Sequence, residues 1–178
     1  GRAGRSGLGG AVAAGAWARP AVAQGAPLKV GLMLPFSGTF AALGENIAAA
    51  FELCLAENGG KFGGRAVTLV RLDDESDPSK APANVNRLLG QDNVDALIGT
   101  GHAGVVMGLV QAAREKEVPL IIPNAGNVAA TRDLCSPSVF RSSFSNWQPA
   151  YGMGKVLASK GVKKAAWVTW DYAAGKES

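Results

Sequence analysis

The sequence is poor in the residues on which catalysis and metal binding usually depend. Its 178 residues include one histidine, His102, and two cysteines, Cys54 and Cys135. A zinc site or a histidine-based catalytic triad needs further partners, and no closely spaced cysteine pair or Gly-x-Ser-x-Gly elbow is present. We therefore expect a protein that is not an enzyme and that carries no metal and no cofactor.

Excess charge of one sign is also small. The chain has 18 lysines and arginines against 14 aspartates and glutamates. Three of the arginines fall in the first 26 residues, and without them the balance is 15 against 14. We therefore expect no nucleic-acid partner, because such partners are attracted by a strong basic excess. Beyond residue 26, no apolar stretch reaches the roughly 18 residues needed to cross a membrane.

Residues 1–26 have the layout of a secretory signal. Arg2 and Arg5 precede an apolar run of small residues from Leu8 to Ala18, and Ala21-Val22-Ala23 fits the pattern at cleavage sites. We expect export to the periplasm with cleavage near Ala23, by either the general or the twin-arginine route. A disordered tail rich in glycine and alanine is the alternative. The first residue is not methionine, and the last residues, 175–178, follow closely on what looks like a strand end, so we interpret the sequence as truncated at both ends.

From Pro27 onward, short apolar segments alternate with segments of helical periodicity. Strands are expected at residues 28–34, 66–72, 94–98, 119–122, 139–142 and 164–169. Helices are expected at residues 46–58, 78–89, 103–117 and 148–160 and from about residue 173, with a loop at residues 38–44. This alternation predicts an α/β fold with a parallel sheet and helices on both faces. Ligands of such sheets bind outside the carboxyl ends of the strands, so the loops there form the candidate site.

The loop after the third strand carries the sharpest motif. Residues Gly99 to Gly104 match Gly-x-Gly-x-x-Gly between a strand and a helix, the local context of a dinucleotide fingerprint. The motif follows the third strand rather than the first, however, and the next strand ends without an acidic residue for a ribose hydroxyl. We therefore favour a small carboxylate, held by free N–H groups at the helix start. An NAD-binding enzyme and a purely structural turn are the alternatives.

The neighbouring loops add amides and aromatic rings. Asn124, Gly126 and Asn127 follow the fourth strand and offer donors to the same carboxylate. Aromatic residues occur in the loops at both edges, namely Phe36, Phe40, Phe144, Trp147, Trp170 and Tyr172. Aromatic walls with few polar anchors are typical of a small-ligand cleft, and ordinary packing is the alternative. His102 either donates a hydrogen bond to the ligand or is a loop residue with a satisfied ring.

Two further features have structural interpretations. The acidic run from Asp73 to Asp77 lacks the spacing of a calcium loop, so we interpret it as a solvated strand end followed by a helix N-cap. Cys54 falls on an apolar helix face and Cys135 in a loop. Export would permit a disulfide, but we expect a small buried hydrophobe and a loop thiol.

Several short motifs follow one another in a characteristic order. They are Leu28–Gly31 with Ser37-Gly38, Asn58–Gly60, Asp73-Asp74 with Asp77-Pro78, Val94–Gly99, Pro119–Pro123 and Val139–Arg141. Over residues 27–178 this order resembles the leucine/isoleucine/valine-type periplasmic binding proteins. The resemblance implies two α/β lobes that close on a ligand, with residues 27–143 as the first lobe and 144–178 as the start of a truncated second lobe. It also implies delivery to the membrane permease of an ABC transporter, and we expect a monomer.

The resemblance further implies positions for ligand contacts. The carboxylate contacts of the family fall on Ala103, Asn124 and Gly126, although Ala103 lacks the usual hydroxyl and His102 lies beside it. The aromatic residue that covers an amino-acid ligand falls near Leu43. A tyrosine of the second lobe falls near Ala174, for which Tyr172 is the nearest substitute.

These departures weaken the amino-acid interpretation. The stretches Ile121–Gly126, Phe140–Pro149 and Tyr172–Glu177 are similar to a subgroup that binds benzoate- and cinnamate-type acids. We therefore expect an aromatic acid with its ring against Phe40, Trp147 or Tyr172. A branched-chain or other amino acid is the alternative within the family.

Overall fold

The computed structural model describes residues 25–178, so the expected signal and its cleavage site lie outside the described residues. A six-stranded sheet has the strand order β2-β3-β1-β4-β5-β6. Its strands are β1 (Leu28–Leu34), β2 (Lys61–Phe62), β3 (Arg65–Asp73), β4 (Ala96–Ile98), β5 (Leu120–Ile122) and β6 (Val139–Arg141). Neighbouring strands are parallel except for the short β2, which pairs antiparallel with β3. The predicted α/β fold is confirmed.

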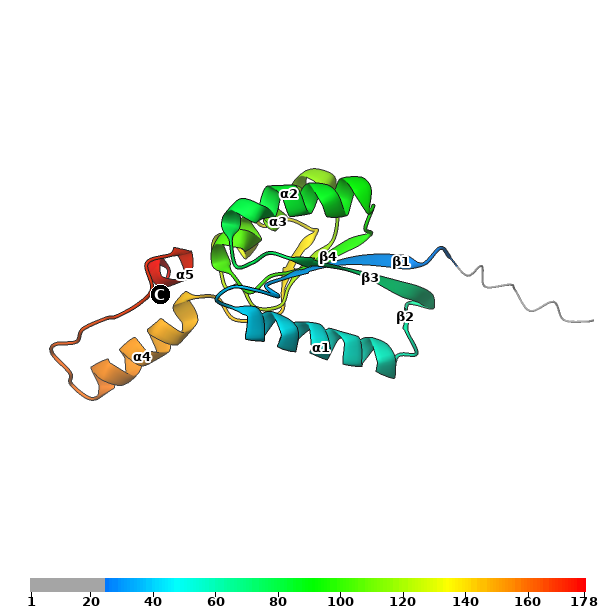
Figure 1. The fold of residues 1–178 in the computed structure, drawn as a ribbon. Coiled ribbons are helices and arrows are strands. Elements are labelled where there is room, and N and C mark those ends of the chain that lie inside the picture. Colours follow the sequence, from blue (N-terminus) through cyan, green and yellow to red (C-terminus); the bar gives the residue numbers. More distant parts are fainter. Residues whose placement is uncertain (1–24) are drawn as a thin grey trace, which may run out of the picture.

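Helices lie on both faces of this sheet (Figure 1). They are α1 (Ala41–Glu57) on one face and α2 (Ala81–Asn86) and α3 (Ala103–Lys116) on the other. Val30, Leu32 and Leu34 of β1 pack with the buried Ala48 of α1. Met33 points to the opposite face and joins the core beneath α2 and α3. Because both faces are covered, β1 is almost continuously apolar, as is typical of a central parallel strand.

Helix α1 begins at Ala41 rather than at Asn46, so the predicted loop at residues 38–44 is wrong in its second half. The first turn of the helix packs against Pro35, the residue that follows β1. A side chain at Gly44 would overlap the carbonyl oxygen of Pro35, so this glycine serves close packing inside a helix rather than a loop. Glycine lowers helix propensity, which is why the sequence pattern indicates a later start.

Two other predicted elements also differ from the structure. The helix predicted at residues 78–89 is divided into a 3-10 turn (Pro78–Lys80), α2 and a wider π turn (Arg87–Gln91). The strand predicted at residues 164–169 is wrong, because these residues pair with no strand in the described part of the chain. A strand needs a neighbour for its N–H and C=O groups, and apolar periodicity alone does not supply one.

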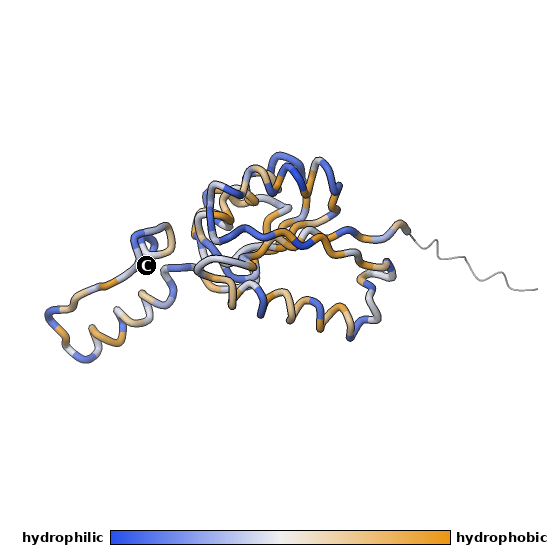
Figure 2. Tube along the Cα trace, viewed as in Figure 1, coloured by the Kyte–Doolittle hydropathy of each residue, from blue (hydrophilic) through white to orange (hydrophobic). Residues whose placement is uncertain are grey.

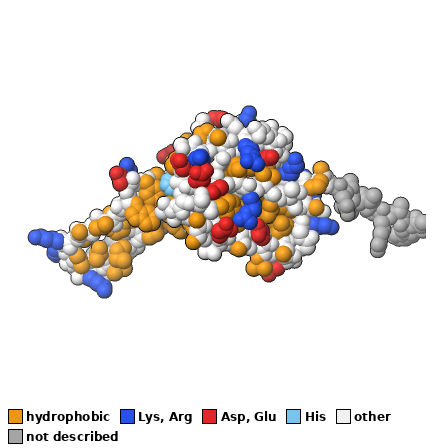
Figure 3. Space-filling model, in the orientation of Figure 1, with side chains coloured by type: hydrophobic (Ala, Val, Ile, Leu, Met, Phe, Trp, Pro, Cys, Tyr) orange, Lys and Arg blue, Asp and Glu red, His pale blue; other side chains and the backbone are white. Residues whose placement is uncertain are grey.

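Residues 144–178, here called the C-terminal segment, leave the sheet after β6 (Figure 1). Helix α4 (Trp147–Ser159) projects away from the sheet and buries none of its residues. The chain then returns, and the short α5 (Ala173–Lys176) lies beside the sheet part again. Hydrophobic residues recur along the trace of the projecting part (Figure 2), and hydrophobic side chains cover its surface (Figure 3). Tyr151, Met153 and Trp167 are among the exposed large side chains of this segment. The C-terminal segment thus contacts the sheet part mainly near its two ends.

The two cysteines are unpaired, and both are exposed. The predicted burial of Cys54 is therefore wrong. The inward stripe of α1 runs through Gly44, Ala48, Phe51 and Leu55, and Cys54 lies beside that stripe, where its side chain stays accessible.

Candidate functional site

A pocket of about 520 Å³ lies between the carboxyl ends of the strands and the returning C-terminal segment. The sheet part contributes Leu43, Gly101, Ala103, Asn124 and Gly126 to its wall. The C-terminal segment contributes Phe144, Asn146, Trp167, Trp170 and Tyr172. The pocket therefore has one wall of small and amide-bearing residues and an opposite wall rich in aromatic rings.

The first wall carries backbone donors that have no partner. The N–H groups of Gly101, Ala103 and Gly126 make no hydrogen bond within the described part of the chain. Ala103 is the first residue of α3, where helix geometry leaves the N–H groups free and the dipole favours negative charge. An anionic group of a ligand can be bound here without any cationic side chain.

His102 caps helix α3 directly. Its Nδ1 accepts hydrogen bonds from the N–H groups of Gly104 (2.9 Å) and Val105 (3.3 Å). An accepting Nδ1 carries no proton, so the proton of the neutral ring resides on Nε2, which is free to donate. Burial lowers the pKa of His102, and the nearby Asp74 and Asp77 carboxylates oppose this only in part. At neutral pH the ring is therefore an uncharged cap with one free donor.

Four rings form a closed circuit across the two walls. The centroid distances are 5.7 Å from Phe40 to His102, 5.1 Å from His102 to Tyr172, 5.8 Å from Tyr172 to Trp170 and 6.0 Å from Trp170 to Phe40. Burial raises the pKa of Tyr172, so its hydroxyl stays protonated at neutral pH. These contacts attach the C-terminal segment to the sheet part and position Phe40, Trp170 and Tyr172 in the pocket wall.

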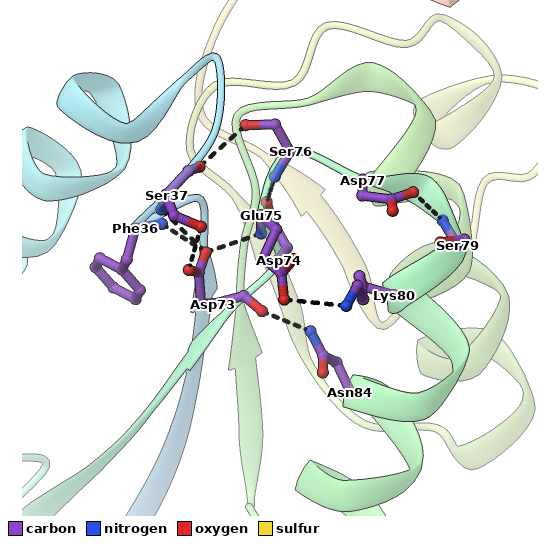
Figure 4. Close-up of polar contacts among 10 residues, drawn as sticks. All are labelled: Phe36, Ser37, Asp73, Asp74, Glu75, Ser76, Asp77, Ser79, Lys80 and Asn84. Carbon is purple, nitrogen blue, oxygen red and sulfur yellow. Dashed lines mark hydrogen bonds and ion pairs between the residues drawn. The ribbon is translucent and has the colours of Figure 1, made fainter.

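The loop that bears Phe40 is held by Asp73 at the end of β3 (Figure 4). The Asp73 carboxylate accepts hydrogen bonds from the N–H groups of Phe36, Ser37 and Glu75 and from the Ser37 hydroxyl. Burial raises the pKa of Asp73, but these hydrogen bonds outweigh burial and hold the pKa below its ordinary value. The ionised carboxylate therefore fastens the first loop to the sheet.

Asp74 corrects the interpretation of the acidic run as a solvated strand end. It is fully buried, and its carboxylate accepts hydrogen bonds from the Thr100 hydroxyl and from the N–H of Ser76. Burial raises the pKa of Asp74 despite these bonds. Asp77 does cap the following turn, as predicted, by accepting from the N–H of Ser79 at 2.8 Å.

Asn146 joins the two walls at the start of α4. Its N–H donates to the Gly126 carbonyl oxygen at 2.8 Å, and its Nδ2 donates to Glu177 Oε2 at 2.7 Å. The same carboxylate oxygen accepts from the N–H of Val128 at 3.2 Å. Glu177 thus ties the region after α5 to the loop that follows β5.

Six of the nine residues singled out in the sequence line the pocket, namely Phe40, Leu43, Ala103, Asn124, Gly126 and Tyr172. His102 lines an adjoining hollow of about 360 Å³ together with Phe40, Trp170 and Tyr172. Asn127 and Trp147 line neither: Asn127 is buried, and the Trp147 ring packs on Tyr151 on the projecting helix.

Sequence reasoning missed Asn146 and Glu177 as candidates. Asn146 stands beside Trp147 in a stretch that the sequence did single out. The sequence does not show, however, which of these two neighbouring side chains faces the pocket. Glu177 gave no local signal, because its partners lie 31 and 49 residues earlier in the chain.

Within residues 25–178 no helix is both long and apolar enough to span a bilayer. The same residues hold no group of three or more histidine, cysteine or acidic side chains arranged for a metal ion.

Comparison with known proteins gives consistent matches. Residues 27–178 match the family model described as periplasmic binding protein. Leu/Ile/Val-binding protein homolog 6 from Brucella abortus (strain 2308) is 33% identical over 152 residues, which are 85% of this chain and 38% of that protein. The chain thus spans about two fifths of the length of this relative.

Two solved structures share the arrangement. A solute-binding protein of an ABC transporter from R. palustris, in complex with benzoate, has a TM-score of 0.81 and 50% identity, covering 85% of this chain and 42% of its own. Another from Rhodopseudomonas palustris BisB5, in complex with 3,4-dihydroxybenzoic acid, has a TM-score of 0.78 and 30% identity, covering 85% and 41%.

Proposed function

Because the chain belongs to the periplasmic binding protein family, we propose that it captures a small aromatic carboxylate for an ABC importer. The family is the one that the sequence motifs indicate, and its members are binding proteins rather than enzymes, which removes the NAD-dependent alternative. One observation carries the proposal: a single pocket combines unbonded backbone N–H groups with a wall of aromatic rings.

In this proposal the ligand lies across the pocket. Its carboxylate binds at the start of α3, where the N–H groups of Gly101 and Ala103 are free. Its ring contacts Phe40, Trp170 and Tyr172 through offset or edge contacts, which suit a flat aromatic group. The benzoate and dihydroxybenzoate bound by the two R. palustris proteins support this ligand class.

The same proposal extends to the organisation of the whole protein. Residues 27–143 form a first lobe, and residues 144–178 begin a second lobe that closes over the ligand. The protein acts outside the cytoplasm after removal of residues 1–23, as a monomer that presents its ligand to a membrane permease. Family membership supports this assignment, since the relatives include solute-binding proteins of ABC transporters.

Calorimetry on the full-length protein tests the ligand class, with benzoate and cinnamate compared with leucine and valine. We expect the aromatic acids to bind and the Trp170→Ala change to weaken them by about 1 kcal/mol, which is the scale of an aromatic contact. Trp147→Ala is the matched control, because this ring lies outside the pocket. Tight leucine binding without a response to aromatic acids would favour the amino-acid alternative and refute the proposed ligand.

A further inference from the structure

We propose that Glu177 orients the side-chain amide of Asn146 so that the pocket presents a hydrogen-bond acceptor, and that the pocket thereby prefers aromatic acids bearing a ring hydroxyl. This inference deepens the proposed function and rests on it. It assigns Asn146 as a specificity-determining residue and Glu177 as a positioning residue that acts through Asn146.

The position of Asn146 is fixed through both its backbone and its side chain. The residue lines the pocket but is only 9% exposed. Its N–H is bound to the Gly126 carbonyl oxygen, and its Nδ2 is bound to Glu177 Oε2 at 2.7 Å. The amide therefore has little freedom to turn away from the pocket.

The chemistry of Glu177 decides which end of the amide is free. An ionised carboxylate only accepts hydrogen bonds, so the partner atom on Asn146 must be the donating nitrogen. The N–H of Val128 donates to the same oxygen at 3.2 Å, which fits an accepting carboxylate. Burial lowers the pKa of Arg141, and the nearby Glu177 carboxylate opposes this lowering.

The carbonyl oxygen of Asn146 is then left for the ligand. Asn146 Oδ1 makes no hydrogen bond within the described part of the chain. It lies over Gly126, where an added side chain would overlap it, so the glycine makes room for this oxygen. Gly126 also has a free N–H, and a hydroxyl can accept from such an N–H while donating to a carbonyl oxygen.

An unpartnered acceptor discriminates between ligands that differ by one hydroxyl. A carboxylate cannot donate to Asn146 Oδ1, which favours placing the ligand carboxylate at Gly101 and Ala103 instead. A bare ring removes water from the oxygen without replacing the hydrogen bond, whereas a ring hydroxyl satisfies it. Sites built to bind a hydroxyl discriminate against the analogue that lacks it for this reason.

The test is calorimetry on the full-length protein with benzoate, 3-hydroxybenzoate and 4-hydroxybenzoate. We expect the wild type to bind benzoate, and at least one hydroxybenzoate at least threefold more tightly. Asn146→Ala should bring the ratio of the dissociation constant of benzoate to that of the preferred hydroxybenzoate to about one. Glu177→Gln should also lower the ratio, because glutamine can donate and lets the Asn146 amide turn over. A purely structural role of Glu177 would weaken all three acids equally and leave the ratio unchanged.

The outcomes separate the two proposals. Binding of aromatic acids without a hydroxyl preference in the wild type overturns this inference and leaves the proposed function standing. A preference that persists in both Asn146→Ala and Glu177→Gln, with circular dichroism showing folded variants, also overturns it. If none of the three acids binds, the proposed function fails and this inference fails with it.

Discussion

Replacing His102 with alanine or asparagine separates the capping role of its ring from its packing role. The imidazole accepts from two N–H groups at the start of α3 and packs between the Phe40 and Tyr172 rings. Loss of an N-cap costs about 0.5–2 kcal/mol, and the lost ring contacts add to this in His102→Ala. Asparagine is a good N-cap residue, so His102→Asn should restore the capping part. In a domain of about 150 residues, 1 kcal/mol corresponds to about 2–4 °C in Tm.

The capping role also predicts how stability depends on pH. Burial lowers the pKa of His102 below its ordinary value of 6.5, because a charged ring loses solvation, and the nearby Asp74 and Asp77 carboxylates oppose this only in part. The unfolded chain then binds the proton more readily. The contribution of His102 is therefore complete above about pH 6.5 and is lost as the pH falls toward the lower pKa of the folded state. Each unit of pKa difference corresponds to about 1.36 kcal/mol.

Urea unfolding of ligand-free wild type and His102→Asn at pH 7.5 and 5.0 measures this contribution. Asp74, whose pKa burial raises, is present in both proteins and largely cancels in their difference. The chain has a single histidine, so no other imidazole within it contributes. We expect acidification to reduce the stability of the wild type relative to the variant. If the free energy of unfolding changes by the same amount in both proteins between pH 7.5 and 5.0, the assignment of Nδ1 as the acceptor is refuted.

Two further substitutions and one sequencing measurement test other parts of the protein. Asp73→Asn should destabilise the protein by about 1–3 kcal/mol in urea unfolding, because the N–H groups of Phe36, Ser37 and Glu75 lose a charged acceptor. Gly126→Ala should lower Tm and weaken aromatic-acid binding, since the added carbon overlaps Asn146, whereas Gly90→Ala has open space and should leave binding unchanged. N-terminal sequencing of the exported protein should begin at or within a few residues of Gln24, and a mature protein that retains Gly1–Ala23 would contradict the proposed cleavage.

The sheet was predictable because its signal is local. Apolar runs such as Leu28–Leu34 reflect a strand covered on both faces, and the alternation of strands and helices fixes a parallel arrangement. That arrangement also places the candidate loops at one edge, which is why most of the predicted site residues line the pocket. The failed strand at residues 164–169 shows the limit of this reasoning, since pairing depends on a neighbour that local periodicity does not reveal.

Burial of polar groups was not predictable for a related reason. Asp74 belongs to an acidic run that looks solvated, yet Thr100 supplies a hydroxyl from 26 residues further along the chain and makes burial tolerable. Glu177 likewise acquires its role from Val128 and Asn146. Trp147 and Asn146 are neighbours in sequence, but only Asn146 faces the pocket, and that choice depends on how the chain leaves β6.

The two walls of the pocket differ in how firmly they are held, and under the proposed function this difference links ligand binding to the contact between the walls. The donors of the first wall follow the buried strands β4 and β5, and the buried Asp74 holds Thr100 in the first of these loops. The aromatic wall belongs to the C-terminal segment, whose long helix buries no residue and which is joined by the ring circuit and the Glu177 contacts. A ligand that contacts both walls stabilises the state in which they lie together by RT ln(1 + [L]/Kd), which is about 2.7 kcal/mol at a concentration of 100 Kd. The contacts of the C-terminal segment with the sheet part therefore need only hold the aromatic rings in position. An aromatic acid with its carboxylate at α3 would supply the remaining free energy that keeps the two walls together.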